Sequence, residues 1–271
     1  MQQHQPSRRW FLSTGGLGVA GIVLARGSAF GGQRGPAASP ADPATVEDLV
    51  AGNRILAREQ VLDAFGHISV RHPRNPDRYL LSRSVAPGLV TSDDIIEYDL
   101  DSKPIDDRGR ASYRERFIHG EIYRSRRDVN AIVHCHTASL LPFGVTNVPL
   151  RPVYHQSSWV AEGVPVFEIR EAGGMTDMLI GDGRLGKALA TTLGPKPAAL
   201  MRGHGAVVVG NSIPTVVGRS VYLDINARVQ LQAMALAGGP ITYIDPEEAK
   251  KYAAPNNYDR AWELWKKQVA R

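Results

Sequence analysis

Cysteine is almost absent from this chain of 271 residues, because Cys135 is the only one. No intramolecular disulfide can form, and a metal site built on several thiolates is excluded. Any metal ion must therefore be held by histidine and carboxylate side chains. Excess basic charge is also small: without Arg8, Arg9 and Arg26, the net charge of +5 falls to about +2. This weak and dispersed charge predicts neither nucleic acid nor an acidic membrane surface as a partner.

Two sequence features that would indicate other classes of protein are also missing. No glycine-rich nucleotide fingerprint follows a strand-like run, so a dinucleotide cofactor is not indicated. The most apolar segment near the N-terminus, Ser13–Ala25, is interrupted by glycines. It is too short and too weakly apolar for a stable transmembrane helix. We therefore expect no contact with a membrane beyond export.

The first residues instead resemble an export signal. Ser7–Leu12 resembles the twin-arginine signal, and the small residues Gly27–Ala29 offer a cleavage site. We predict a twin-arginine signal peptide at residues 1–29, with a retained N-terminal anchor as the alternative. The resemblance implies export of an already folded protein to the periplasm. Residues 30–44 are rich in Gly, Pro and Ala without periodicity, which predicts a flexible linker.

Helical and strand-like patterns alternate irregularly along the remaining residues, 45–271. Apolar residues recur at helical spacing from Thr45, and period-two alternation follows at His67–Arg71. A turn rich in Pro, Asn and Asp separates that run from Tyr79–Leu81, which predicts a hairpin. The other predicted elements are a helix at Ser112–Arg126, strands at Ala131–His136, Ala199–Met201 and Ala206–Gly210, and helices at Thr215–Ala237 and Asp259–Ala270. This order predicts a mixed α/β layered domain rather than a strictly parallel doubly wound sheet.

Three histidines form the candidate metal site. In a strand, residues two apart point to the same face, so His134 and His136 present two imidazoles together while Cys135 points away. Such a pair alone is equally compatible with a structural or incidental role. His204 strengthens the interpretation, because a histidine between two glycines lies at a sharp bend and can reach into a cleft. Three protein ligands leave positions open for water or substrate, as in catalytic sites.

A carboxylate is predicted near these ligands. Glu115 and His119 lie four residues apart and share one face of the predicted helix that leads into the His134 strand. The alternative for Glu115 is a surface position within a charged run. For His119 we favour a helix-packing role with a hydrogen-bond partner.

Four segments occur together along the chain: Phe65–Arg71, Glu115 with His119 and Tyr123, Val133–His136, and Gly203–Gly210. In order and spacing they resemble the class II aldolase/adducin family, over roughly Val46–Leu236. The resemblance implies a three-layer α/β/α domain with a central mixed, largely antiparallel sheet. It implies a homotetramer with sites near the subunit interfaces. It also implies one divalent metal ion per subunit (Zn, Mn or similar) on His134, His136 and His204, with Glu115 as the acid–base group.

The chain departs from the sugar-phosphate members of that family where they bind phosphate. Their Gly-Asn, Ser-Gly and Ser-Ser pairs are replaced here by Gly66-His67, Ser82–Val85 and Tyr113-Arg114. Small, flexible residues that let backbone amides approach a phosphate are largely gone, which disfavours a phosphorylated sugar. Arg83, Arg114 and His67 could instead bind a planar carboxylate. The alternative is that the two arginines face solvent.

Asn75–Tyr79 and Arg83–Pro87 are most similar to the branch that decarboxylates hydroxylated aromatic or heteroaromatic carboxylates. The resulting hypothesis is a metal-dependent carbon–carbon lyase, a decarboxylase acting on a non-phosphorylated small-molecule hydroxy-carboxylate. An aldolase or epimerase acting on a sugar, a sugar phosphate or a hydroxy-keto acid is the alternative enzyme. A non-catalytic binding module, as adducin-like members imply, and a metal-sequestering protein are the alternatives outside catalysis.

Overall fold

The computed structural model describes residues 42–253 and 258–270. The predicted signal peptide, the predicted cleavage site and the predicted linker up to residue 41 lie outside this part. Helix α1 (Pro43–Arg58) begins with proline in its first turn, where the missing N–H breaks no helical hydrogen bond. The last two residues of the predicted linker are therefore helical. Within the described ranges, no helix has the length and apolar character needed to cross a membrane.

A seven-stranded sheet forms the centre of the domain, in the order β3-β2-β1-β4-β7-β6-β5. Its neighbours pair antiparallel except for β5 and β6, which are parallel. The predicted hairpin is confirmed as β1 and β2. The strands are β1 (His67–Arg71), β2 (Arg78–Ser82), β3 (Ile95–Asp99), β4 (Ala131–Cys135), β5 (Val166–Phe167), β6 (Ala198–Met201) and β7 (Gly205–Gly210).

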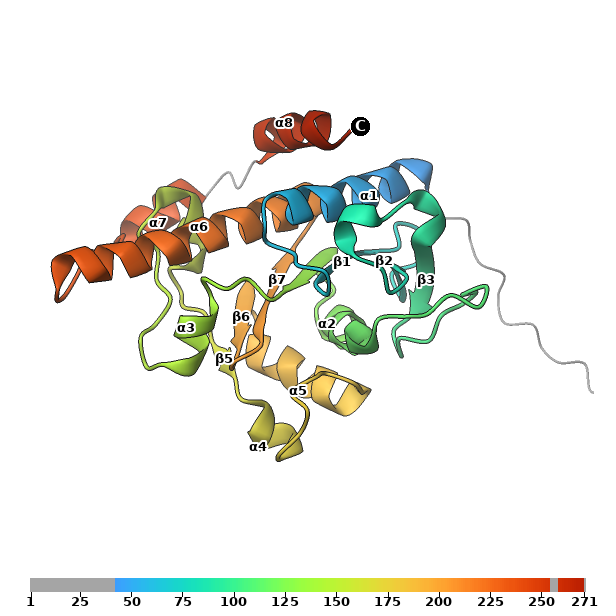
Figure 1. Ribbon diagram of the computed structural model, residues 1–271, viewed down its shortest axis with the longest axis horizontal. Coiled ribbons are helices and arrows are strands. Elements are labelled where there is room, and N and C mark those ends of the chain that lie inside the picture. The colour runs from blue at the N-terminus through green and yellow to red at the C-terminus, as the bar shows by residue number, and fades with distance from the viewer. Residues whose placement is uncertain (1–41, 254–257, 271) are drawn as a thin grey trace, which may run out of the picture. The chain divides into compact units, whose positions relative to one another are not determined.

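Helices cover both faces of the sheet, as the resemblance predicts (Figure 1). Helices α1, α6 (Ile213–Ala237) and α8 (Asp259–Val269) pack together on one face. Helices α2 (Phe117–Ser125) and α5 (Gly183–Leu193) pack against each other on the opposite face. The other helices are α3 (Leu141–Val145), α4 (Ile169–Gly173) and α7 (Pro246–Ala253), with single-turn or short 3-10 segments at Pro87–Leu89, Ser92–Asp94, Arg114–Arg116 and His155–Val160. The predicted α/β/α architecture with a mixed, largely antiparallel sheet is confirmed.

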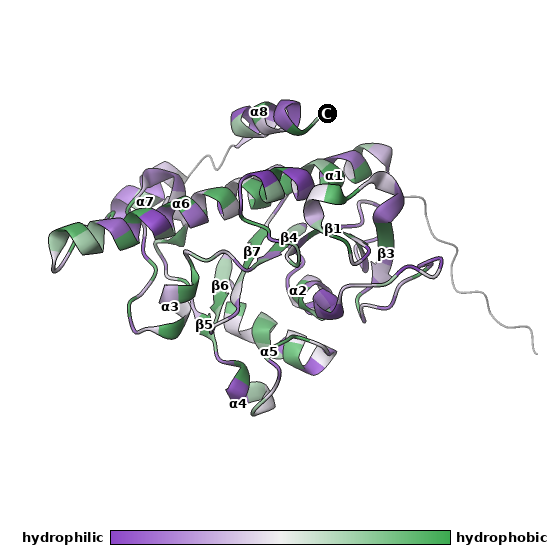
Figure 2. Ribbon diagram, in the orientation of Figure 1, coloured by the Kyte–Doolittle hydropathy of each residue, from purple (hydrophilic) through white to green (hydrophobic). Residues whose placement is uncertain are grey.

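Strand periodicity divides the apolar residues into two cores, one on each face of the sheet. Val133 packs under α1 and α6, whereas its neighbour Ile132 packs under α2 and α5. Figure 2 shows the apolar character of β6 and β7, which are buried on both faces. Trp262 and Trp265 of α8 belong to the first core.

The start of α2 differs from the prediction in a way that affects the candidate site. Helix α2 begins at Phe117, and Glu115 lies before it in a 3-10 turn with non-helical dihedral angles of −89° and 17°. Glu115 therefore does not share a continuous α-helix with His119, although both face the sheet. The kink frees the Glu115 carboxylate to bond outside the helix, where it accepts the Ile180 N–H at 2.8 Å.

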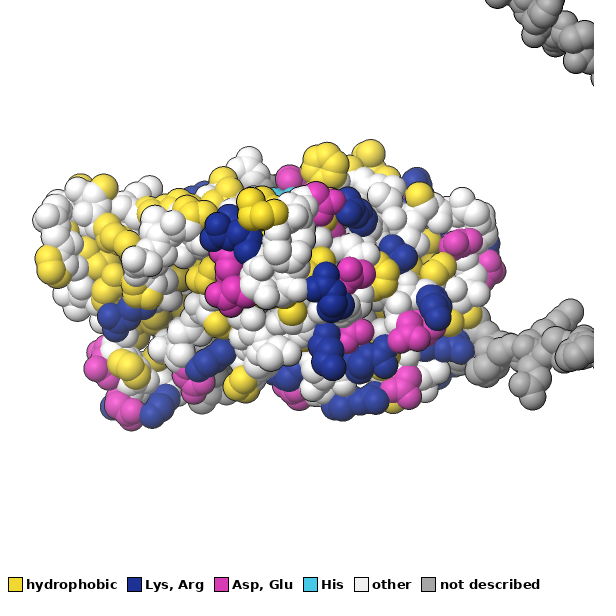
Figure 3. All heavy atoms as spheres, turned by 90° about the horizontal axis from the view of Figure 1, so that it is seen from below, with side chains coloured by type: hydrophobic (Ala, Val, Ile, Leu, Met, Phe, Trp, Pro, Cys, Tyr) yellow, Lys and Arg dark blue, Asp and Glu magenta, His cyan; other side chains and the backbone are white. Residues whose placement is uncertain are grey.

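On the face turned toward the viewer in Figure 3, basic and acidic side chains are mixed. Ion pairs among the described residues include Arg124 with Asp101 at 2.5 Å and Arg170 with Glu168 at 2.7 Å.

Candidate metal centre and active site

The sheet brings the three predicted histidine ligands together from distant parts of the sequence. His134 is the fourth residue of β4, and His136 follows immediately after that strand ends. Strand β4 pairs with β7, so the turn between β6 and β7 lies next to His136 and carries His204. Gly203 flanks this turn in the left-handed region, with φ of +63°. The structure thus brings His204 to the other two histidines at a glycine-flanked bend.

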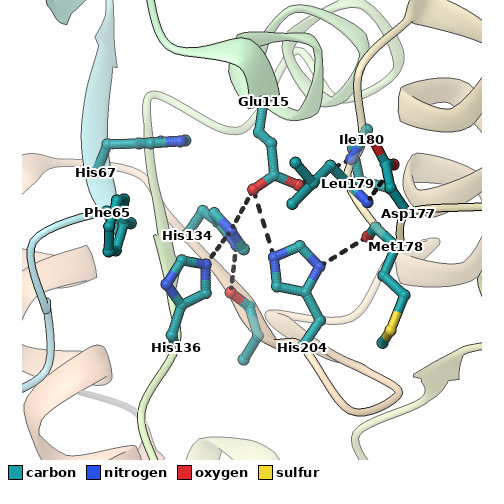
Figure 4. Close-up of polar contacts among 12 residues, drawn as sticks. Phe65, His67, Glu115, His134, His136, Asp177, Met178, Leu179, Ile180 and His204 are labelled. Carbon is teal, nitrogen blue, oxygen red and sulfur yellow. Dashed lines mark hydrogen bonds and ion pairs between the residues drawn. The ribbon is translucent and has the colours of Figure 1, made fainter. Parts of the chain in front are cut away.

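Their ligand atoms converge with the Glu115 carboxylate on one small volume (Figure 4). One donor atom from each of the four residues lies within 4.8 Å of the others. Glu115 Oε2 lies 3.4 Å from His134 Nε2 and 3.3 Å from His204 Nε2. The Nε2 atoms of His134 and His136 are 3.1 Å apart. Three imidazoles and one carboxylate at such separations suit a single divalent ion.

Each histidine is oriented through its other ring nitrogen. The Nδ1 of His134 donates to the Ala206 carbonyl at 3.1 Å, and that of His204 donates to the Met178 carbonyl at 3.0 Å. The Nδ1 of His136 lies 3.1 Å from the Asp63 carboxylate. With the proton at Nδ1 in all three rings, the lone pair of each Nε2 faces the centre, as metal ligation requires.

Buried polar atoms without partners support the same conclusion. The Nε2 of His204 is buried and has no hydrogen-bond partner in the described part of the chain. An unpaired buried nitrogen costs free energy unless a ligand satisfies it. Imidazole and carboxylate donors suit Zn, Mn, Co, Ni or Fe, and no thiolate contributes, because Cys135 points into the opposite core. The residues present therefore fit a divalent metal ion.

Electrostatics keep Glu115 ionised. Burial by itself would raise the pKa of Glu115, but its interactions with His134 and His204 outweigh burial and hold the pKa far below its usual range. Burial would lower the pKa of His204, yet the Glu115 carboxylate overcomes this and raises it. The pKa of His136 is lowered, mainly by burial and by His134. Glu115 thus enters the site as a carboxylate that can accept a proton.

Of the three predicted substrate-binding residues, His67 lies at the centre. It is paired with His134 across the strands β1 and β4, and the two ring centroids are 5.2 Å apart. His67 is buried, and its Nδ1 lies 2.7 Å from Nε2 of His119. The prediction that His119 packs with a hydrogen-bond partner is confirmed by this contact. The binding role of His67 stays a prediction.

The two predicted arginines pair with acidic residues instead of lying free. Arg83 binds Asp94 at 2.6 Å, and its side chain is 38% exposed. Arg114 binds Asp177 at 2.6 Å, and its side chain is 59% exposed. Both guanidinium groups are partly solvent-exposed, as in the alternative reading of the sequence. Neither belongs to the four-residue cluster, and their binding of a carboxylate stays a prediction.

Sequence reasoning missed the groups that orient the ligands. Asp63 comes from the loop after α1, and its Oδ1 also accepts the N–H groups of Phe65 and Gly66, both at 2.8 Å. The acceptors at Met178 and Ala206 are backbone carbonyl groups, which residue type does not reveal. These contacts join residues far apart in the sequence, so no local pattern could have revealed them.

Comparison with known proteins places the chain in a family. Residues 47–231 match the family described as Class II Aldolase and Adducin N-terminal domain. The chain is 37% identical over 248 residues to Decarboxylase tropJ of Talaromyces stipitatus, covering 83% of this chain and 93% of that protein. It is 26% identical over 240 residues to 3,4-dihydroxyphthalate decarboxylase of Arthrobacter keyseri, covering 83% and 92% of the two chains. The solved L-fuculose 1-phosphate aldolase from Glaciozyma antarctica shares the fold, with a TM-score of 0.69 at 23% identity over 86% of this chain and 93% of that one.

Proposed function

This chain belongs to the class II aldolase and adducin family as a lyase of that type, and we propose that it is a metal-dependent decarboxylase of a hydroxylated aromatic carboxylate. The observation that carries the proposal is the convergence of Glu115 Oε2 with the Nε2 atoms of three histidines. The two decarboxylases similar to this chain over more than nine tenths of their own length support the reaction type. The second, a 3,4-dihydroxyphthalate decarboxylase, supports an aromatic acid as substrate.

The ligand set proposed for one divalent ion per subunit is His134, His136 and His204. When bound, such an ion would supply Lewis-acid stabilisation of negative charge on a substrate oxygen. The protein fixes the three rings through Ala206, Asp63 and Met178, which removes the freedom to rotate before ligand binding.

Glu115 would transfer the proton. Its Oε1 is anchored by the Ile180 N–H, which leaves Oε2 directed at the centre. As an ionised carboxylate, Oε2 accepts the proton of the substrate hydroxyl. The bond between the ring and the carboxylate carbon then breaks, carbon dioxide leaves, and the electron pair stays on the ring carbon. That carbon takes the proton from Oε2, which restores the carboxylate.

A binding module without catalysis is disfavoured by the donor set. Such a protein has no need for three oriented imidazoles beside a buried carboxylate, and Glu115 is 7% exposed. A site whose ligands leave a position open suits turnover better than metal storage.

The proposal is tested with the purified, metal-replete protein and three groups of compounds. These are hydroxyaryl carboxylates, hydroxy-keto acids and phosphorylated ketoses. We expect metal-dependent carbon dioxide release from the first group, lost in a His134→Ala/His136→Ala variant. Aldehyde formation from the second or third group, without carbon dioxide from the first, would replace the decarboxylase with an aldolase.

Two further properties are proposed with this function. We propose export through the twin-arginine segment, supported by Ser7–Leu12, so that a variant with Arg8→Lys and Arg9→Lys remains in the cytoplasm while the parent reaches the periplasm. We also propose a homotetramer, which sedimentation of the mature protein tests directly. A fully active monomer would contradict it.

A further inference from the structure

A row of buried polar side chains connects the candidate active site to the interior of the domain. His67 and Ser69 project from β1 toward α2, and His119 and Tyr123 face them from that helix, four residues apart. Their contacts are consecutive: His67 Nδ1 to His119 Nε2 at 2.7 Å, His119 Nδ1 to Ser69 Oγ at 2.6 Å, and Ser69 Oγ to the Tyr123 hydroxyl at 2.8 Å. None of the four side chains is more than 1% exposed.

The direction of these hydrogen bonds is fixed at the Tyr123 end. Within residues 42–253 and 258–270, the Tyr123 hydroxyl has a single hydrogen-bond partner, Ser69 Oγ. A buried O–H group without an acceptor is strongly disfavoured, so Tyr123 donates to Ser69. The Ser69 hydroxyl can accept this bond and donate its own proton onward. Its other partner is His119 Nδ1, which must therefore be an acceptor.

This direction determines the tautomers of both histidines. A hydrogen bond between two imidazoles needs one donor and one acceptor. Because His119 Nδ1 accepts the Ser69 hydroxyl, it carries no proton, so the ring is neutral and has one proton. With Nδ1 accepting from Ser69, that proton lies on Nε2 and is donated to His67 Nδ1. The single proton of a neutral His67 is then on Nε2.

The Nε2 of His67 is turned toward the site. Figure 4 shows the His67 ring projecting from β1 toward Glu115 and His134. No hydrogen bond to this nitrogen is formed within the part of the chain that the structure describes. The Tyr113 ring packs 4.5 Å from the His67 ring and restricts its rotation. An N–H donor is therefore held ready beside the metal ligands.

We propose that Tyr123, Ser69 and His119 are positioning residues that hold His67 as the Nε2–H tautomer, so that His67 offers a neutral hydrogen-bond donor to the substrate carboxylate. This inference rests on the proposed decarboxylase function.

A neutral donor suits this reaction for a physical reason. Decarboxylation converts a charged carboxylate into uncharged carbon dioxide. A cation bound to the carboxylate would stabilise the substrate more than the transition state and slow the reaction. A neutral N–H group orients the carboxylate but stabilises the charged substrate less than a cation would, so it slows the reaction less. Arg83 and Arg114 are already paired with Asp94 and Asp177, so neither offers an unpaired cation to the leaving group.

The same row does not act as a channel for protons to solvent. Its inner end, Tyr123, is fully buried, and the Arg71 guanidinium lies 4.7 Å from the centre of its ring. Burial raises the pKa of Tyr123 well above its usual range, which keeps the phenol protonated. The row therefore ends in a hydroxyl group that always donates, and this fixed direction determines the histidine tautomers.

The test is a measurement of histidine tautomers by long-range ¹H–¹⁵N correlation spectroscopy on zinc-loaded protein labelled at the imidazole nitrogens. His67→Gln and His119→Gln variants assign the signals. We expect both rings as Nε2–H in the parent. In Tyr123→Phe, Ser69 no longer accepts a hydrogen bond from Tyr123 and can accept one from His119 Nδ1 instead. A second population of His67 with the proton on Nδ1 should therefore arise. Tyr98→Phe, which removes a hydroxyl from the same core, should leave the tautomers unchanged. His67 found as Nδ1–H or doubly protonated in the parent overturns the proposal.

Kinetics provide a second, independent readout. His67→Leu removes the donor and should raise KM for the carboxylate by about tenfold or more, whereas His67→Gln keeps an N–H and should recover most of that loss. An equal effect of both substitutions, or a change in kcat alone, contradicts the donor role. The spectroscopic result needs no turnover, so a protein with the expected tautomers but no carbon dioxide release would disprove the proposed function alone.

Discussion

A Cβ atom placed on Gly205 would lie 2.0 Å from the carbonyl oxygen of Cys135. The turn that carries His204 can therefore approach the end of β4 only because residue 205 has no side chain. The same close approach sets the distance between His204 and the other two ligands. The glycine that follows His204 is thus a requirement of the proposed metal site as well as of the turn.

We expect Gly205→Ala to destabilise the fold by about 3 kcal/mol and to reduce metal binding, because the added methyl group must push β7 away from β4. Urea unfolding and metal analysis of the folded fraction measure the two effects. Gly109→Ala is the matched control, since Gly109 also has a positive φ of +74° but no atom within 4 Å of the added Cβ. Equal losses in the two variants would mean that backbone strain, not the close approach, is the cause.

Asp63 supports His136 from outside the ligand set. We expect Asp63→Asn to weaken metal affinity by about 10- to 100-fold, because the neutral amide holds the imidazole less firmly and makes it a weaker ligand. Competition with a chromophoric chelator measures this. Asp106→Asn, at an exposed position whose side chain is 65% accessible, controls for the change of charge. Unchanged affinity in Asp63→Asn would exclude a supporting role for this carboxylate.

Glu115 is expected to act in turnover rather than in folding. Glu115→Gln keeps an oxygen that can accept the Ile180 N–H, so the fold should persist. We expect kcat to fall by about 10²- to 10⁴-fold, because the amide cannot take the substrate proton. Glu47→Gln, on the exposed side of α1, is the control and should leave kcat unchanged. A Glu115→Gln enzyme with near-normal kcat would remove Glu115 from the mechanism.

Asp94 should contribute stability that depends on pH. Burial would raise the pKa of Asp94, but hydrogen bonds from Thr91 and the ion pair with Arg83 outweigh it and lower the pKa below 3.8. The contribution is therefore complete well above pH 3.8 and is lost as the pH falls through the lower folded-state value. We expect Asp94→Asn to lose about 1 kcal/mol at pH 7 and much less at pH 2, measured by urea unfolding. Its exposed neighbour gives the control variant Asp93→Asn, and a pH-independent loss in Asp94→Asn would contradict this account.

The grouping of the three candidate metal ligands could be predicted from the sequence because their signals are local. Period-two alternation places His134 and His136 on one side of a strand, and two glycines identify the bend at His204. The start of α2 could not be predicted, because the helical spacing of apolar residues continues through the 3-10 turn that holds Glu115. The Glu115 side chain in this turn accepts the N–H of Ile180, 65 residues away, and no local pattern indicates this contact.

The ion-pair and hydrogen-bond partners of the predicted substrate-binding residues could not be predicted from the sequence either. Asp177 lies 63 residues after Arg114, and nothing near either residue indicates the ion pair. His119 was correctly assigned a hydrogen-bond partner, but its identity as His67, 52 residues away, required the pairing of β1 with α2. The partners of charged and polar side chains depend on tertiary contacts, whereas strands and turns can be predicted from local sequence patterns.

The most direct test of the central claim is a metal titration of carbon dioxide release. Metal-free protein is given increasing amounts of one divalent ion, and release from a hydroxyaryl carboxylate is followed at each step. We predict that activity rises in proportion to bound metal and stops at one ion per subunit, with no rise in a His134→Ala/His136→Ala variant. Release that is independent of added metal, or that persists in this variant, would contradict the account.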